Sequence, residues 1–261
     1  MGVQDGGRST RRAIRSLTAA TILAVLAVCP VQARRARSPN LVEFFDAGRH
    51  RAVPVALYGY RNDFRARPLA VISHGHGGSA TGYGFLTEAL VRRGFIVASI
   101  QHVELPGDPA MASSGNLAEL RRPLWQIGAD SIGFVARQLR ASGMADPAAG
   151  LVLIGHSNGG DMTMLFASQH PERVAVALSL DNRRMPLPRL ARPRICSMRS
   201  TDQTADAGVL PDAAEKVRLG MVVVTVPVTH DHMDDTATGP QRQDMLRVLH
   251  ACLRGVSLRD R

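Results

Sequence analysis

Apolar strand-like runs and amphipathic helix-like segments alternate along the chain from about residue 50. The strand-like runs are continuously apolar, which is typical of strands that helices cover on both faces. We expect strands at residues 69–73, 95–100, 151–154, 174–180, 194–198 and 221–228. We expect helices at residues 82–93, 117–142, 161–169 and 241–253. This alternation predicts an α/β protein with a mostly parallel, doubly wound sheet flanked by helices.

The first 33 residues have the composition of an export signal. Four arginines within residues 8–15 precede an apolar stretch at residues 16–29, and small residues follow at 31–33. This order predicts a signal peptide at residues 1–33 and a single domain at residues 34–261, secreted or periplasmic after cleavage. A lipoprotein site at Cys29 is less favoured because Val28 is bulky, and an anchor helix because the apolar run is short.

The positive charge of the chain does not by itself indicate a nucleic-acid partner. The 32 basic and 22 acidic residues leave a formal charge of +10, and aromatic residues make up only 4% of the chain. The arginines are scattered, so neither a basic stripe nor a stacking platform for bases is present in the sequence. We expect no nucleic-acid partner and no obligatory membrane partner.

The segment Gly-His-Ser-Asn-Gly-Gly at residues 155–160 lies between an expected strand and an expected helix. In that context, G-x-S-x-G predicts a nucleophile elbow, a tight turn that exposes the serine at the end of a strand. Ser157 is therefore the candidate nucleophile. The amide of Asn158, at the start of the following helix, is a candidate donor to a developing oxyanion.

A second glycine-rich turn, His-Gly-His-Gly-Gly at residues 74–78, follows the first of the expected core strands. Glycines at such a position let a backbone N–H point at the reacting carbonyl, and we nominate the amide of His76 as the second oxyanion donor. The alternative is a turn that needs glycine for its geometry alone. His74 is expected to orient the turn rather than to take part in chemistry.

Two histidines and two aspartates are candidates for the base and the acid. His230 and His232 follow the last expected strand, where the order Ser…Asp…His places a base that takes the proton of the serine. Asp181 and Asp202 each follow an earlier expected strand. Their positions alone do not decide between the members of either pair, because aspartate is also common in turns.

Together these motifs resemble the α/β-hydrolase superfamily, and within it the platelet-activating-factor acetylhydrolase branch and the neighbouring dienelactone-hydrolase-like branch. The resemblance spans roughly residues 68–250 and rests on the segments 72–78, 93–98, 155–160, 180–186 and 230–235. It implies an α/β-hydrolase fold, and because no long insertion separates the elbow from Asp181, we expect no large lid domain. It also implies Ser157 as nucleophile, Asp181 as acid and His230 as base, with Asp202 and His232 as the alternatives.

This chain departs from the two branches at a few positions. Met233 stands where an aromatic residue is common, and Ser157 stands where true dienelactone hydrolases have cysteine. Because of this serine, dienelactone hydrolysis is not expected. The polar and charged residues that follow Asp181 argue against a lipid substrate.

The expected function is that of an exported serine carboxylesterase that cleaves small or soluble acyl esters. A peptidase or amidase, and a lipase or phospholipid acetylhydrolase, are alternatives that use the same triad. A metal hydrolase built on His74, His76, His230 and His232, and a non-catalytic binding protein, are alternatives of other classes. We expect a small-molecule ester as the partner and neither a cofactor nor a metal.

Cys196 and Cys252 are the cysteines that follow the expected signal peptide. Two cysteines in an exported protein form a disulfide when their Cα atoms lie close enough. A pair of buried thiols is equally consistent with the sequence.

Overall fold

The computed structural model describes residues 1–3, 38–60 and 65–255. The chain divides into residues 1–33 and residues 34–261, and the fold below is that of the second unit. The predicted signal peptide, apart from its first three residues, lies outside the described residues. In the part of the chain that is described, no helix combines the length and the apolar character needed to cross a membrane.

An eight-stranded sheet forms the centre of this unit, in the order β1-β2-β4-β3-β5-β6-β7-β8. The strands are β1 (Asn40–Asp46), β2 (Arg51–Tyr58), β3 (Leu69–Ser73), β4 (Ile96–Ile100), β5 (Leu151–His156), β6 (Val174–Leu180), β7 (Arg194–Arg199) and β8 (Val222–Thr225). The pairings β1 with β2 and β2 with β4 are antiparallel, and the others are parallel. The parallel strands therefore end at one common edge, where α/β proteins place their sites.

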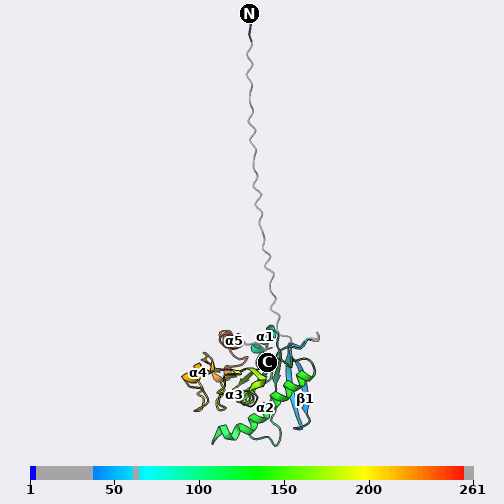
Figure 1. The fold of residues 1–261 in the computed structure, drawn as a ribbon, viewed down its shortest axis with the longest axis vertical. Helices are drawn as coiled ribbons and strands as arrows, with labels where there is room; N and C mark the ends of the chain where they lie inside the picture. Colours follow the sequence, from blue (N-terminus) through cyan, green and yellow to red (C-terminus); the bar gives the residue numbers. More distant parts are fainter. Residues whose placement is uncertain (4–37, 61–64, 256–261) are drawn as a thin grey trace. The chain divides into compact units, whose positions relative to one another are not determined.

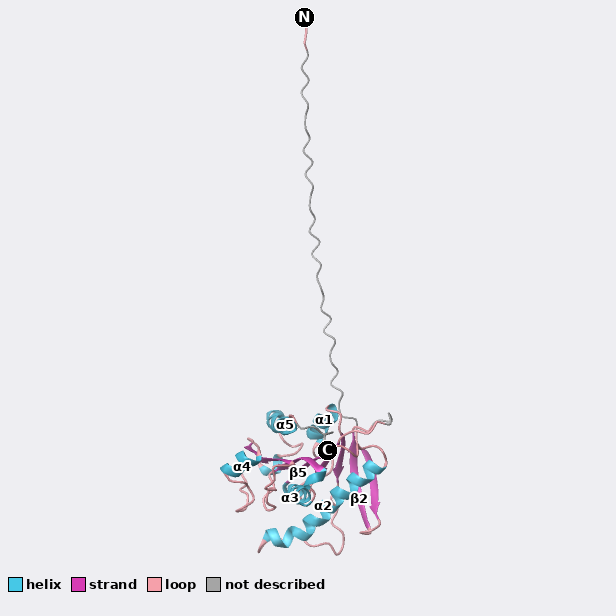
Figure 2. Cartoon of the chain, viewed as in Figure 1, coloured by secondary structure: helices cyan, strands magenta, loops and turns pink. Residues whose placement is uncertain are grey.

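Helices cover both faces of the sheet (Figures 1 and 2). They are α1 (Gly84–Arg92), α2 (Leu117–Ala141), α3 (Ser157–Gln169), α4 (Ala213–Leu219) and α5 (Gly239–Leu253), with short 3₁₀ turns η1 (Pro171–Arg173) and η2 (His230–His232). Figure 2 shows α2 and α3 on one side of the strands and α1 and α5 on the other. The sheet is thus doubly wound, as the alternation in the sequence predicts.

Two apolar cores fill the two faces of the sheet. In β5, Leu151 and Leu153 join the core under α2 and α3, whereas Val152 and Ile154 join the core under α1 and α5. All four side chains are buried, because successive side chains of a strand point to opposite faces and both faces are covered. This explains why the strands appear as continuous apolar runs in the sequence.

All six predicted strands and all four predicted helices are confirmed as elements, and all but β3 and β6 have shifted ends. The helix predicted to begin at residue 161 begins at Ser157, directly after β5. The strand predicted to reach residue 228 ends at Thr225, two residues before Pro227, which has no N–H for a ladder. The prediction misses β1, β2 and α4. The strand β2 contains Pro54, which is unusual in a strand. The helix α4 buries no residue, so its sequence has no apolar stripe that would indicate a helix.

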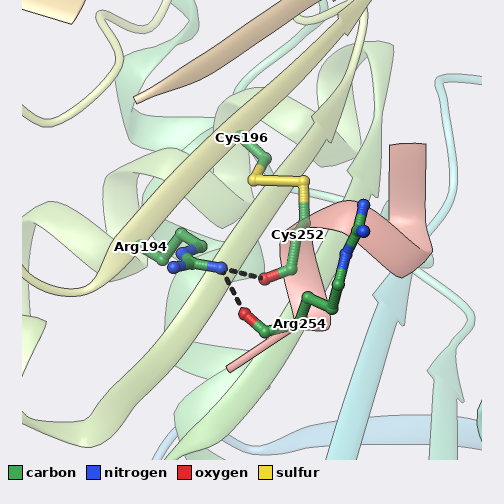
Figure 3. The surroundings of a disulfide bond; sticks show 4 residues. All are labelled: Arg194, Cys196, Cys252 and Arg254. Carbon is green, nitrogen blue, oxygen red and sulfur yellow. Dashed lines mark hydrogen bonds between the residues drawn. A yellow bond between two sulfur atoms is a disulfide. The ribbon is translucent and has the colours of Figure 1, made fainter. Parts of the chain in front are cut away.

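A disulfide joins β7 to α5 (Figure 3). It links Cys196 and Cys252, whose Cα atoms lie 6.4 Å apart, and both residues are fully buried. Beside it, the Arg194 guanidinium donates to the carbonyl oxygens of Cys252 and Arg254 at 3.3 and 2.7 Å. The structure thus decides the pairing that the sequence leaves open, and it ties the last helix to the sheet.

Reducing this disulfide is expected to destabilise the protein. The crosslink spans 56 residues, for which loop-closure entropy gives roughly 4 kcal/mol. That corresponds to a fall in Tm of roughly 10 °C for a domain of this size. Thermal unfolding with and without dithiothreitol measures it, and a Cys196→Ala/Cys252→Ala double variant serves as control. A wild-type Tm that responds to reductant no more than that of the double variant would contradict the crosslink.

Candidate active site

The elbow after β5 holds Ser157 in a strained backbone conformation. Ser157 has φ of +52°, a region that residues other than glycine seldom occupy. The flanking glycines are sterically required: a Cβ on Gly155 would lie 2.2 Å from the carbonyl oxygen of Gly159, and a Cβ on Gly159 would lie 2.3 Å from that of His74. The sequence G-x-S-x-G therefore forms this turn because no larger side chain fits on either side of the serine.

Three side chains from separate strand ends meet at this turn. Nε2 of His230 lies 2.9 Å from Oγ of Ser157, and Nδ1 of His230 lies 2.6 Å from Oδ2 of Asp181. Ser157 follows β5, Asp181 follows β6, and His230 lies in η2 after β8. The structure brings together the three residues that the family resemblance singles out. The arrangement allows the imidazole to accept the hydroxyl proton while the carboxylate holds its other nitrogen.

Asp181 is fully buried and surrounded by donors. The amide and hydroxyl of Ser200 donate to its two carboxylate oxygens at 3.1 and 2.7 Å, and the Arg199 guanidinium forms an ion pair with it at 2.7 Å. Burial by itself would raise the pKa of Asp181, but the hydrogen bonds from His230 and Ser200 and the charge of Arg199 together hold that pKa below its ordinary value. Asp181 is therefore an anion at neutral pH.

The two alternative residues occupy other positions. Asp202 accepts a hydrogen bond from the backbone amide of His230 at 2.7 Å, so it contacts the main chain of this histidine rather than its ring. The ring of His232 contacts the Thr229 hydroxyl through Nδ1 at 2.8 Å. Within the described residues, the side chains of Asp202 and His232 form their hydrogen bonds with the His230 amide and the Thr229 hydroxyl rather than with the Ser157 hydroxyl or the His230 ring. Both help to shape the loop that presents His230.

A buried hydrogen-bonded path links the glycine-rich turn after β3 to the backbone of His230. The Gly75 amide donates to the Tyr83 hydroxyl at 3.3 Å, and that hydroxyl donates to Nδ1 of His156 at 2.9 Å. Nε2 of His156 then donates to the His230 carbonyl oxygen at 3.0 Å. Burial raises the pKa of Tyr83, so its hydroxyl keeps its proton. His156, the variable residue before the serine in the elbow motif, thus positions the loop that carries His230.

Stability is expected to fall in mild acid, in part through His156. Burial, followed by the proximity of His230, lowers the pKa of His156 to about 4, whereas an unfolded histidine titrates near about 6.5. Between these values the unfolded chain binds a proton that folded His156 does not. This contribution is therefore fully present above about pH 6.5 and is lost at about 1.4 kcal/mol per pH unit as the pH falls.

Urea unfolding between about pH 7.5 and pH 5 measures this dependence. A His156→Gln variant keeps one donor and one acceptor but does not titrate. We expect its free energy of unfolding to fall less steeply with pH than that of the wild type. Equal slopes for the two proteins would show that His156 does not contribute.

The glycine-rich turn lies directly against the serine. A Cβ on Gly75 would lie 3.3 Å from Cβ of Ser157. Within the described residues, the backbone amides of His76 and Asn158 have no hydrogen-bond partner. The Asn158 side chain is turned away toward α2, where its Oδ1 accepts from Trp125 Nε1 at 2.8 Å. Both nominated residues also line a hollow beside this turn, where their amides are available to a ligand.

His74 is held entirely by protein contacts. Its Nδ1 lies 2.6 Å from the carbonyl oxygen of Gly75, so Nδ1 carries the proton. Its Nε2 accepts from the His102 amide and from the Gln101 side chain, each at 3.0 Å. Burial lowers the pKa of His74, which keeps the ring neutral. This is the orienting role that we expect from its place in the turn.

A hollow opens beside the glycine-rich turn on the side of α2. Its volume is about 530 Å³, including its open mouth. The hollow is lined by both nominated oxyanion residues, by apolar side chains of β2, α2 and α3, and by His102, which follows β4. At the mouth, the exposed side chains of His76 and Glu104 lie 3.2 Å apart.

Several residues that organise the site are missed by the sequence analysis. Arg199 ends β7 and Ser200 follows it, at the sheet edge that carries Asp181, so the common edge of parallel strands was the signal that could have identified them. Asp161 accepts from the amides of Arg184 and Met185 at 3.1 and 2.8 Å and thereby holds the loop after Asp181. Burial raises the pKa of Asp161 to about 6. No local pattern distinguishes Asp161 from other polar helix residues.

Neither a protein-family model nor a curated protein matches this sequence. The structure is similar to solved structures, however. The chain is 20% identical to a ferulic acid esterase from Streptomyces cinnamoneus, with a TM-score of 0.53, over 76% of this chain and 74% of that one. It is 11% identical to a ferulic acid esterase from the anaerobic fungus Anaeromyces mucronatus, with a TM-score of 0.61, over 87% and 96%. It is 14% identical to a bacterial heroin esterase, with a TM-score of 0.57, over 87% of both chains.

These similarities identify the fold. The unit is an α/β-hydrolase fold with a mostly parallel, doubly wound sheet, and the predicted fold class is confirmed. The narrower resemblance to the platelet-activating-factor acetylhydrolase and dienelactone-hydrolase-like branches stays a prediction. At these identities a shared fold does not establish a shared activity.

Proposed function

We propose that this protein is a serine carboxylesterase. The observation that carries the proposal is the unbroken hydrogen-bonded path from Ser157 through His230 to Asp181 at the carboxyl edge of the sheet. A serine hydroxyl is a weak nucleophile until an adjacent base takes its proton, and a third group must keep that base in the correct tautomer. The contacts of 2.9 and 2.6 Å support these roles.

In the acylation step, Oγ of Ser157 attacks the ester carbonyl carbon while Nε2 of His230 takes the hydroxyl proton. The amides of His76 and Asn158 stabilise the negative charge on the carbonyl oxygen, a contribution worth about 10²- to 10³-fold in rate for a single donor. Asp181 stabilises the imidazolium that forms. His230 then gives its proton to the leaving alcohol as the carbon–oxygen bond breaks.

In the deacylation step, a water molecule attacks the acyl-enzyme and His230 takes the proton of that water. The tetrahedral intermediate collapses, the carboxylic acid leaves, and the proton returns to Oγ of Ser157. The same two amides stabilise the second oxyanion. The chain's own residues supply each proton transfer in the cycle.

The similar structures include both esterases and peptidases. Two are named as ferulic acid esterases and one as a heroin esterase, and this chain covers 74%, 96% and 87% of them. A dipeptidyl aminopeptidase and an acylaminoacyl peptidase are covered to only 36% and 42%, so the similarity in length favours an ester over an amide. Between Ser157 and Asp181 the chain forms only α3, η1 and β6, and the absence of an inserted lid domain there favours a small or soluble acyl ester over a long-chain lipid. These observations support carboxylic ester hydrolysis as the activity of this site.

Labelling with a fluorophosphonate probe, followed by peptide mapping, tests the proposal. We expect a single modified residue, Ser157, and loss of labelling after heat unfolding. A short-chain 4-nitrophenyl ester and the matching 4-nitroanilide separate the two kinds of bond. Preferred cleavage of the anilide would identify an amidase, and a folded protein that is not labelled would exclude a serine hydrolase.

We also propose that the protein acts outside the cytoplasm. The basic and apolar composition of residues 1–33 and the disulfide between Cys196 and Cys252 support this location, because structural disulfides persist in oxidising compartments. The amino-terminal sequence of protein recovered from the exported fraction tests it, with a start close to residue 34 as the expected result. Intact residues 1–33 on protein recovered from the cytoplasm would contradict it.

A further inference from the structure

The proposed mechanism assigns the two halves of an ester to two sides of the site. His230 must reach the leaving oxygen to protonate it, so the alcohol half lies on the His230 side of Ser157. The carbonyl oxygen lies between the amides of His76 and Asn158. The acyl half takes the third direction at the carbonyl carbon, and the hollow, which both His76 and Asn158 line, is the space beside that point that could receive it.

The walls of this hollow combine apolar and polar side chains. Leu124 and Ile127 of α2, Met162 of α3 and Val53 of β2 line it. Such apolar side chains fit the carbon skeleton of an acyl group. The polar lining of the hollow therefore decides which functional groups the acyl chain can carry.

One buried polar atom in this lining lacks a partner. Nε2 of His102 is buried and has no hydrogen bond within the described part of the chain. A buried polar atom of this kind costs free energy unless a ligand or water satisfies it. The His102 ring lies beside that of His74, with 5.5 Å between the ring centroids, and His74 is itself fixed by the contacts described above.

The neighbouring polar side chains in the hollow are already engaged. The Gln101 side chain binds the Ala80 amide and His74. The Ser131 hydroxyl donates to the carbonyl oxygen of Ile127 at 2.8 Å. Arg51 forms an ion pair with Asp108 and donates to the carbonyl oxygen of Val103. His102 is therefore the side chain with capacity to bind a polar group of the substrate.

The electrostatics favour an uncharged group on the substrate. Burial, with smaller contributions from His74 and Arg51, lowers the pKa of His102 to about 3, so the ring is neutral. The charge of Arg51 is matched by Asp108, and Glu104 at the mouth disfavours a carboxylate. A hydroxyl both donates and accepts a hydrogen bond, so it satisfies Nε2 of His102 in either neutral tautomer.

We propose that the hollow is the acyl subsite and that Nε2 of His102 binds a hydroxyl group on the acyl chain, so that the preferred substrates are esters of hydroxylated carboxylic acids. This inference rests on the proposed esterase function. It adds a specificity-determining residue and a substrate class to that function.

Pairs of methyl esters that differ only in a hydroxyl group test the inference. The rate of hydrolysis of each ester is measured by titration of the acid that is released. One pair is methyl 3-hydroxybutanoate and methyl butanoate, and a second is methyl 3-(4-hydroxyphenyl)propanoate and methyl 3-phenylpropanoate. For at least one pair we expect kcat/KM to be about 10- to 100-fold higher for the hydroxylated ester, within the range for a site that binds a substrate hydroxyl. Monomethyl succinate, with a carboxylate in place of the hydroxyl, is expected to be a poor substrate.

Variants at two histidines complete the test. The His102→Phe variant keeps an aromatic ring of similar shape. In this variant, the ratio of kcat/KM for the hydroxylated ester to kcat/KM for the plain ester should fall to about 1. His250→Phe replaces a histidine of α5, on the face of the sheet opposite α2, and should keep the wild-type ratio. Thermal unfolding of both variants checks that they fold.

The outcomes separate this inference from the proposed function. Turnover of plain esters through Ser157 with a wild-type ratio near 1 in both pairs would overturn the subsite assignment and leave the esterase function in place. A ratio that persists in His102→Phe would overturn the role of His102, and preference for monomethyl succinate would overturn the hydroxyl. Absence of both turnover and labelling at Ser157 would overturn the esterase function and the subsite with it. If His102→Phe does not fold, the wild-type ratios alone decide.

Discussion

Replacing Ser157 by alanine is expected to lower kcat for a short-chain ester by about 10⁶-fold, the cost of removing the nucleophile from a serine triad. The loss is large because no other hydroxyl contacts Nε2 of His230 within the described residues. A rate of about 10³- to 10⁴-fold above that of water should persist, because the oxyanion amides and the acyl subsite remain.

Steady-state kinetics and fluorophosphonate labelling measure this loss. Ser142→Ala is the matched control, because the Ser142 hydroxyl donates to the carbonyl oxygen of Leu139 at the end of α2, away from the sheet edge that carries Ser157. The control should keep wild-type activity and labelling. A Ser157→Ala protein that retains more than about one-hundredth of the wild-type kcat would show that another group is the nucleophile, because no triad lacking its serine is expected to do so.

Replacing Asp181 by asparagine is expected to lower kcat by up to about 10⁴-fold. The carboxylate oxygen that lies 2.6 Å from Nδ1 of His230 holds a proton on that nitrogen and leaves Nε2 free to accept from Ser157. An amide NH₂ in its place stabilises the opposite tautomer. Asp181 has φ of +56°, which asparagine tolerates, so the backbone should keep its conformation.

The same substitution is expected to reduce stability. Arg199, with a side chain only 7% exposed, forms its ion pair with Asp181. Removing the anion leaves a buried cation without its ion-pair partner, although the guanidinium still donates to the carbonyl oxygen of Asn182, and this loss costs about 3 kcal/mol. Urea unfolding measures this loss separately from kcat.

Asp202→Asn is the matched control for Asp181→Asn. Asp202 accepts from the His230 amide rather than from its ring, and an asparagine oxygen can accept from the same amide. We expect a loss in kcat of less than about 10-fold, in keeping with the net value of one hydrogen bond. A greater loss from Asp202→Asn than from Asp181→Asn would reverse the assignment of the acid.

The sequence by itself determined the layered fold and the position of the candidate nucleophile in its elbow. Continuous apolar runs alternating with amphipathic segments permit little other than a doubly covered parallel sheet. The elbow is equally local, because Gly155 and Gly159 are required by contacts of 2.2 and 2.3 Å around a single turn. The fold class and the elbow depend on residues that are close together in the chain, and such features can therefore be predicted from the sequence.

The tertiary structure decided which side chains meet. Parallel strands bring Asp181 and Asp202 to the same edge, so chain order cannot separate them, whereas side-chain direction turns Asp181 to the ring of His230 and Asp202 to its backbone. The disulfide between Cys196 and Cys252 likewise depends on a Cα separation of 6.4 Å across 56 residues. The lack of a hydrogen-bond partner for Nε2 of His102 can be recognised only from the three-dimensional positions of the neighbouring donors and acceptors. Contacts between residues far apart in the chain depend on distances of a few ångströms, and local patterns do not encode those distances.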